Sequence, residues 1–164
     1  MGKAVTRKQA EQMLENALEI GARMLISGAE ISRVEDSILR ICTAYGSERT
    51  EVFSITYTIV ATISSKTFGI ITQSRRIHGL AFNLQELTYL NNLSRSVCEN
   101  LPGMDEVRRD LKLIHELPRY TNRQGMLIYA LISSAFTLFF GGTLLDAVIS
   151  AAIGVMIKVV EIPL

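Results

Sequence analysis

The sequence lacks the motifs that mark most enzymes and metal proteins. It contains no phosphate-binding loop, no GxGxxG motif and no HExxH motif, and its two histidines, His78 and His115, stand alone. Its two cysteines, Cys42 and Cys98, form neither a disulfide framework nor a metal-binding pair, which fits a reducing compartment. We therefore expect no cofactor, no metal and no enzymatic activity. A hydrolase built from scattered Ser, His and Asp side chains stays open as an alternative, because such residues meet only in the fold.

Charge is almost missing from the end of the chain. Of the 17 Lys and Arg residues only Lys158 lies beyond residue 123, and of the 16 Asp and Glu residues only Asp146 and Glu161 do. The N-terminus has no apolar core of a signal peptide. No basic patch stands out, so nucleic acid is not an expected partner. A charged front followed by a nearly uncharged end indicates a hydrophilic module that leads into a membrane.

Residues 125–157 form a long apolar run. The run contains no proline, and Asp146 is its only charged residue. About 18 apolar residues suffice for a membrane-spanning helix, and the pair Gly141-Gly142 divides the run. We predict transmembrane helices at about residues 126–141 and 143–160. A buried hairpin of core helices in a soluble protein is the alternative.

The predicted domains are therefore a hydrophilic domain over residues 1–122 and membrane helices over residues 123–164. The chain stops soon after the second span, so we expect these helices to begin a longer membrane bundle. Arg119 and Arg123 precede the first span, which places the hydrophilic domain in the cytoplasm by the positive-inside rule.

Two helices are predicted at the start of the hydrophilic domain. Apolar residues recur with a helical period over residues 8–26 and again from residue 31 to residue 45. Gly28 lies between the two patterns, where a left-handed cap residue is needed. Glu30 and Glu35 lie at the start of the second helix, where acids complement the helix dipole. These acids, and Arg33 beside them, are therefore open to a purely structural interpretation.

Strands and two further helices follow. Residues 52–64 and 66–74 are rich in Val, Ile, Thr, Phe and Tyr and predict a β-hairpin, with a turn at residues 64–66. A leucine stripe predicts a helix over residues 80–99, and a short charged helix is expected over residues 105–116. The expected fold is an α+β module of two helices, a β-hairpin and two helices, followed by a transmembrane helical hairpin. Two strands alone are marginal, so the hairpin needs the helices or a second copy of the chain.

Asp146 is the residue of the apolar run with the clearest functional potential. A carboxylate within a membrane span is costly and is usually retained for a proton, a cation or a substrate amino group. The alternative is that Asp146, just after the Gly-Gly turn, caps the second helix in water.

Four stretches in this order resemble the N-terminal part of the threonine/serine exporter family of bacterial membrane proteins. They are MLISGAEISRVEDSILRICTAYG (residues 24–46), the Arg75-Arg76 pair after the strands, NLQELTYLNNLSR (residues 83–95) and AFTLFFGGTLLDAVISAAIG (residues 135–154). The resemblance covers nearly all of the chain. It rests on the order and spacing of the four stretches rather than on any one of them.

The resemblance implies a hydrophilic domain ahead of a bundle of transmembrane helices, in the bacterial cytoplasmic membrane. It implies export of threonine, serine or a dicarboxylate driven by the proton gradient, by one chain or with a second, all-membrane subunit. The family's motif residues fall on Glu30, Arg33, Glu35, either Arg75 or Arg76, Asn83 and Asp146. We take Glu30, Arg33, Glu35, Arg76 and Asn83 as polar contacts in the hydrophilic module, and Asp146 as the proton or substrate site.

The sequence thus predicts a transporter subunit that contacts a small amino acid or dicarboxylate and the lipid bilayer, and that forms a homo-oligomer. The alternative is a membrane-anchored regulatory or assembly module that binds a partner subunit and never contacts substrate.

Overall fold

The computed structural model describes residues 5–116 and 121–161. These belong to two compact units, the N-terminal unit Met1–Leu117 and the C-terminal unit Pro118–Leu164, each of which is described by itself. The elements of the N-terminal unit, in chain order, are α1 Arg7–Ile26, α2 Ile31–Ala44, β1 Arg49–Ile55, β2 Thr58–Ser65, β3 Gly69–Arg76, α3 Leu84–Asn100 and α4 Met104–His115. The C-terminal unit contains α5 Asn122–Phe139 and α6 Leu144–Glu161. The α+β class and all the predicted helices are confirmed.

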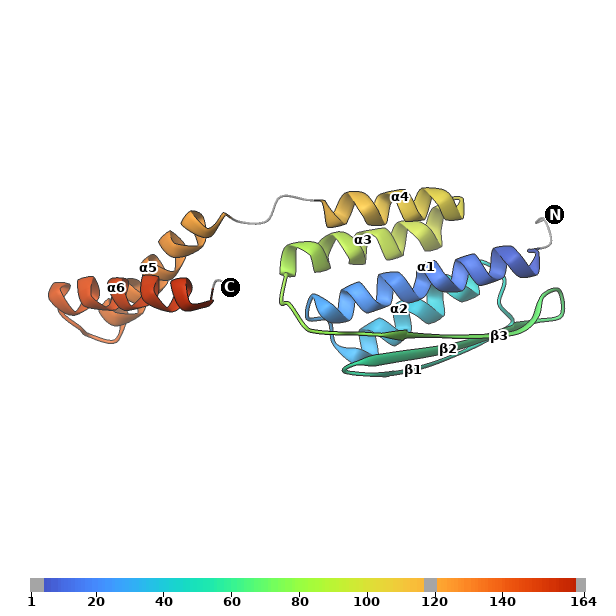
Figure 1. Cartoon of the computed structure of the whole chain (residues 1–164), viewed down its shortest axis with the longest axis horizontal. Helices are drawn as coiled ribbons and strands as arrows, with labels where there is room; N and C mark the ends of the chain where they lie inside the picture. Colours follow the sequence, from blue (N-terminus) through green and yellow to red (C-terminus); the bar gives the residue numbers. More distant parts are fainter. Residues whose placement is uncertain (1–4, 117–120, 162–164) are drawn as a thin grey trace. The chain divides into compact units, whose positions relative to one another are not determined.

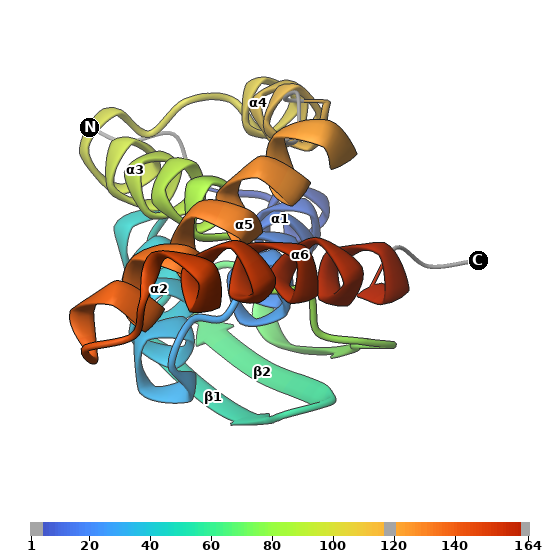
Figure 2. The ribbon, with the colours of Figure 1, turned by 90° about the vertical axis from the view of Figure 1, so that its left-hand side faces the viewer.

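The N-terminal unit has three layers (Figures 1 and 2). The antiparallel sheet, in the order β1-β2-β3, forms one outer layer, and the pair α3 and α4 forms the other. Helices α1 and α2 lie between them, with α1 in contact with β2, β3, α3 and α4. This middle position places α1 within reach of a strand on one side and of a helix on the other.

Helix α1 is buried around most of its circumference because it has neighbours on both sides. Its buried positions include Met13, Leu14, Leu18 and Ile20, which do not fall on a single narrow stripe. Gly21 lies where α2 approaches closely, since a Cβ there would be 2.5 Å from the Cδ1 atom of Ile38. Small residues on α1 therefore let the two helices of the middle layer pack tightly.

The predicted β-hairpin is confirmed only in part, because β2 and β3 pair as an antiparallel hairpin but the sheet has a third strand, β1. The expected first strand, residues 52–64, is broken at Thr56-Tyr57 into β1 and β2, and the expected turn at residues 64–66 lies two residues further on. Thr and Tyr favour strands, so no turn-forming residue marked the break. The buried residues Ile59, Ala61 and Ile63 alternate along β2, so one face of the sheet covers the helices.

The third predicted helix begins four residues later than expected, at Leu84 rather than at residue 80. The Asn83 side chain accepts a hydrogen bond from the backbone N–H of Glu86 at 3.1 Å and so starts α3. The residues before it are held against the end of α1, where Ala81 N–H donates to the carbonyl oxygen of Ile26 at 2.9 Å. Gly28 follows α1 with φ of +98°, which confirms its predicted left-handed conformation.

The C-terminal unit is a helical hairpin of α5 and α6, joined near Gly141, which has φ of +87°. The helices cross at Gly154, where a Cβ would lie 2.7 Å from the carbonyl oxygen of Tyr129. Thr137 Oγ1 donates to Ser150 Oγ at 2.7 Å across the same contact. The predicted helical hairpin is confirmed. Among residues 5–116 and 121–161, however, no helix has both the length and the apolar character needed to cross a bilayer, so the transmembrane prediction is not confirmed.

Candidate functional site

A charged cavity of the N-terminal unit lies between α1, β3 and α4. Glu15, Glu19 and Arg23 follow one another at four-residue intervals and so share one face of α1. The cavity has a volume of about 250 Å³. We call it the Glu19 cavity. Its lining residues are Glu15, Asn16, Glu19, Arg23, Arg75, Arg108, Leu111, Lys112, His115 and Glu116.

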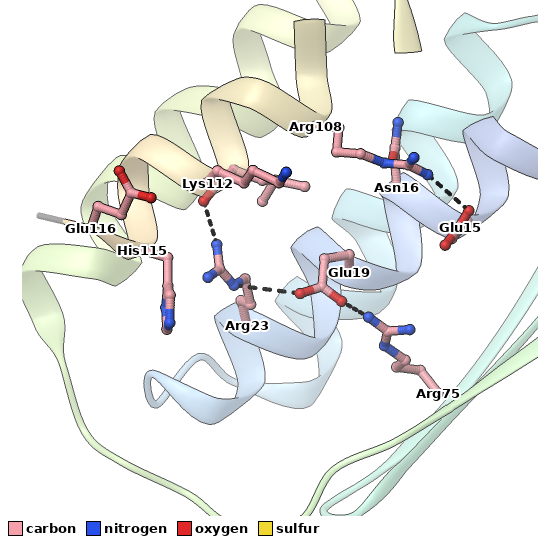
Figure 3. Close-up of a pocket in the computed structure, with 10 residues that line it drawn as sticks. Glu15, Asn16, Glu19, Arg23, Arg75, Arg108, Lys112, His115 and Glu116 are labelled. Carbon is pink, nitrogen blue, oxygen red and sulfur yellow. Dashed lines mark hydrogen bonds and ion pairs between the residues drawn. The ribbon is translucent and has the colours of Figure 1, made fainter. Parts of the chain in front are cut away.

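Glu19 lies at the centre of the charge network in this cavity (Figure 3). One of its carboxylate oxygens, Oε2, accepts from the Arg75 guanidinium of β3. The other, Oε1, lies 3.5 Å from Nε of Arg23, one turn along α1. The side chains of Glu19 and Arg23 are 31% and 14% exposed, so solvent screens this pair less than it screens a fully exposed one. A single carboxylate thus links the sheet to the middle helix layer.

Helix α4 is fixed to α1 by three further polar contacts. Arg23 donates to the carbonyl oxygen of Leu111 at 2.6 Å, and Arg108 pairs with Glu15 at 3.1 Å. Asn16, which is buried, donates through Nδ2 to the carbonyl oxygen of Met104 at 2.9 Å. Its side-chain oxygen Oδ1 stays available as an acceptor in the cavity wall.

Three ionisable side chains at the α4 side of the cavity are not used by these contacts. Among the described residues, Lys112, His115 and Glu116 make no side-chain hydrogen bond or ion pair. Figure 3 shows the three side chains along the α4 wall. A cation and a carboxylate that are both unpaired at one cavity match the carboxylate and ammonium groups of a zwitterion.

The structure places the predicted acids and arginine of α2 outside the Glu19 cavity. Glu30 is exposed at the N-cap of α2, and its side chain makes no capping hydrogen bond. Arg33 is exposed on the same helix. Glu35 is half-buried, and its Oε1 accepts from the backbone N–H of Ser54 in β1 at 2.7 Å. Glu35 therefore connects α2 to the edge of the sheet.

Arg76 and Asn83 also lie apart from the cavity. Arg76 pairs with Thr58 in the sheet register, whereas Arg75 pairs with the buried Ile59. Because side chains alternate along a strand, Arg75 faces the helices and Arg76 faces away from them. The strand period was the signal that would have selected Arg75. Asn83 has the capping role described above.

Asp146 lies in the C-terminal unit, in the first turn of α6. Its Oδ2 accepts from the Oγ1 hydroxyl of Thr143 at 2.7 Å and from the Thr143 backbone N–H at 2.9 Å. The backbone N–H of Asp146 in turn donates to Thr143 Oγ1 at 3.3 Å. This reciprocal pattern is a capping box, with an acid at the helix start where the dipole favours it.

The structure therefore does not gather the predicted site residues into one place, and their functional roles stay predictions. The residues that sequence reasoning missed are Glu19 and the unpaired group of α4, which carry no motif and meet only through the packing of α1 against α4. Within the two described ranges, no group of three or more His, Cys, Asp or Glu side chains is placed to hold a metal ion.

The family comparison covers both units. No curated protein and no solved structure matches the chain. A family model described as "Putative threonine/serine exporter" matches residues 15–164. This match includes the residues of the Glu19 cavity and of the α5–α6 hairpin, and it indicates a transport role. The chain belongs to the threonine/serine exporter family.

Proposed function

We propose that this chain is part of a transporter that exports threonine, serine or a small carboxylate, and that the Glu19 cavity binds the substrate on the N-terminal unit. The observation that carries the proposal is a lysine and a glutamate on one cavity wall, Lys112 and Glu116, that have no side-chain partner among residues 5–116 and 121–161. In this proposal Lys112 binds the substrate carboxylate. Glu116 and the Asn16 side-chain oxygen bind its ammonium group.

The neighbouring network supports a small, polar ligand. Glu19 is already engaged by Arg75 and Arg23, and Glu15 by Arg108, so these groups shape the cavity without demanding a counter-ion. A volume of about 250 Å³ suits a small molecule rather than a peptide or a nucleic acid. In this proposal the paired charges therefore set the shape of the Glu19 cavity, and the unpaired charges supply its affinity for the substrate.

The α5–α6 hairpin is proposed as the start of the membrane part, in the bacterial cytoplasmic membrane with the N-terminal unit in the cytoplasm. Its large apolar side chains point outward, including Phe139 at 80% and Val160 at 84% exposure. Such surfaces are covered by lipid or by further helices. We propose that these helices come from further copies or from a second, all-membrane subunit, that the proton gradient drives export, and that Asp146 serves as a proton or substrate site.

Titration calorimetry with the full chain and L-threonine tests substrate binding. We expect saturable binding that Lys112→Gln weakens by about ten- to a hundredfold, because one charge-assisted hydrogen bond contributes about 1.5–3 kcal/mol. Lys66→Gln, at the exposed turn between β2 and β3, is the matched control and should bind as the unchanged protein does. Equal affinities for all three proteins would contradict the assignment of Lys112.

Transport itself is measured as uptake of labelled threonine into inverted membrane vesicles that contain the full protein and its partner subunits. Asp146→Asn should lower the proton-driven rate, since an amide keeps the size of the side chain but cannot carry a proton. Unchanged transport by this variant would leave Asp146 with its capping role alone.

The alternative is an assembly module that binds a partner subunit without contacting substrate. The observation that favours it is the outer face of the sheet, where Phe53, Ile55 and Ile70 are 65%, 50% and 71% exposed. Absence of binding by any small amino acid or carboxylate, together with loss of partner co-purification in Phe53→Ser, would favour this function.

A further inference from the structure

A second polar groove lies in the N-terminal unit, between α2 and α3. It has a volume of about 300 Å³, and none of the residues that line the Glu19 cavity belongs to it. Its lining residues are Arg33, Asp36, Ser37, Arg40, Asn91, Ser94, Arg95, Cys98 and Glu99. We call it the α2–α3 groove.

Three arginines line this groove, and two of them have no partner. Arg40 pairs with Asp36 at 2.9 Å, one turn back on α2. Among the described residues, Arg33 on α2 and Arg95 on α3 make no side-chain hydrogen bond or ion pair. Glu99 is the other acid of the lining and is likewise unpaired. Two guanidinium groups on facing helices thus remain for one ligand, opposed by one carboxylate.

The floor of the groove is polar but contributes few donors. The hydroxyls of the buried residues Ser37 and Ser94 donate to the backbone of their own helices, at Arg33 O and Asn91 O. Asn91 uses one amide hydrogen on Leu87 O at 2.9 Å and keeps the other. The donors available to a ligand are therefore the two unpaired guanidinium groups, one amide N–H and the N–H groups of Arg40 that Asp36 does not engage.

We propose that the α2–α3 groove binds a compact, soluble oxyanion, with Arg33 and Arg95 holding it from opposite walls. A planar guanidinium binds carboxylate or phosphate oxygens through two parallel hydrogen bonds, so two such groups suit an anion with several oxygens. The groove's own acids limit the net charge to +1, which favours a small anion over an extended polyanion. This inference does not rest on the function proposed for the Glu19 cavity.

Cys98 provides a built-in reporter, because it lines the groove and is half-buried. The other cysteine, Cys42, is fully buried. Alkylation of the full chain with neutral iodoacetamide at fixed pH and ionic strength is followed by mass spectrometry at each cysteine. Inorganic phosphate is the probe, and chloride at the same ionic strength is the comparison.

We expect phosphate to slow the labelling of Cys98 saturably and to leave that of Cys42 unchanged. Arg33→Gln and Arg95→Gln should each raise the phosphate concentration needed for half-protection about tenfold, the loss of one charge-assisted contact. Arg49→Gln is the matched control, since Arg49 is an exposed arginine of β1 outside the groove. It should behave as the unchanged protein.

Three results would overturn the proposal. The first is equal protection by chloride, which would indicate screening alone. The second is phosphate protection that neither arginine variant alters. The third is protection by anionic liposomes but not by free phosphate, which would assign the groove to a lipid surface. If an arginine variant fails to fold, titration calorimetry of the unchanged chain with phosphate and with acetate decides whether a multivalent oxyanion binds.

Discussion

The two units of the chain use apolar side chains in opposite ways. In the N-terminal unit, Leu14 and Ile38 are completely buried, and the core extends from the sheet through both helix layers. In the C-terminal unit, α5 has no buried residue and α6 has only Ala147 and Gly154. The helices of the second unit therefore touch each other through small and hydroxyl-bearing residues and direct their large apolar side chains outward.

This difference shows that hydropathy and burial are separate properties. The N-terminal unit folds around its apolar residues, so its surface is left for charges and for the two polar cavities. The α5–α6 hairpin cannot enclose its apolar residues, because two helices have too little mutual surface. The outward-facing apolar side chains of the hairpin therefore need a cover that the hairpin itself does not supply.

The largest difference between the two units is expected when one leucine in each is replaced by alanine. Leu14→Ala should lower the free energy of unfolding by about 2–5 kcal/mol, because it removes a fully buried side chain and leaves a cavity. Leu145→Ala, at a position that is 76% exposed, should change it by less than about 0.5 kcal/mol and instead weaken retention of the chain by liposomes. Urea denaturation and liposome flotation measure the two effects. Equal losses of stability would remove the distinction between the units.

A smaller effect tests how the second unit is held together. Gly154→Leu should destabilise the α5–α6 contact by about 1–3 kcal/mol, since the backbone oxygen of Tyr129 cannot yield to a new Cβ 2.7 Å away. Hydrogen exchange of the α5 and α6 amides reports the loss of protection. Ile153→Leu, at the adjacent exposed position, is the control and should exchange as before.

The smallest effect is expected from Tyr45→Phe, which tests a hydrogen bond in the N-terminal unit. Burial raises the pKa of Tyr45 to about 12, and its hydroxyl donates to the carbonyl oxygen of Pro102 at 2.6 Å. Burial likewise raises the pKa of the Cys42 thiol to about 12. Because the pKa of each group is higher in the folded state, folding favours its neutral form. This contribution to stability is complete below the pKa of the unfolded state and is lost as the pH rises through the pKa of the folded state.

Stability should therefore fall between about pH 9 and pH 12, and Tyr45→Phe should remove only the contribution of Tyr45, which lies between about pH 10 and pH 12, and leave that of Cys42. The same variant should cost about 1 kcal/mol at neutral pH through the lost hydrogen bond. Urea midpoints over this pH range measure both quantities. A variant as pH-sensitive as the unchanged protein would assign the whole effect to Cys42.

Local patterns predicted most of the elements and failed where tertiary contacts decide. The helix stop at Gly28 followed from its conformational freedom, and the four helices of the N-terminal unit followed from their apolar patterns. The two helices of the C-terminal unit followed from one apolar run that Gly141-Gly142 divides. The turn at Thr56-Tyr57 was missed because both residues favour strands, and the sheet register imposes the turn. The start of α3 was placed too early because the leucine stripe continues into residues that lie outside the helix, before the Asn83 cap and against the end of α1.

The sequence by itself determined the helical periods, the separation of a charged region from an uncharged one and the family resemblance, because each depends only on residue types and their order along the chain. Only the tertiary structure decided which charges meet. Glu19 reaches Arg75 across 56 positions, and Arg23 reaches the end of α4 across 88, because α1 lies between two layers. Likewise, the α2–α3 groove exists only because two helices from distant segments pack side by side. Cavities are products of packing between elements, and no local pattern records them.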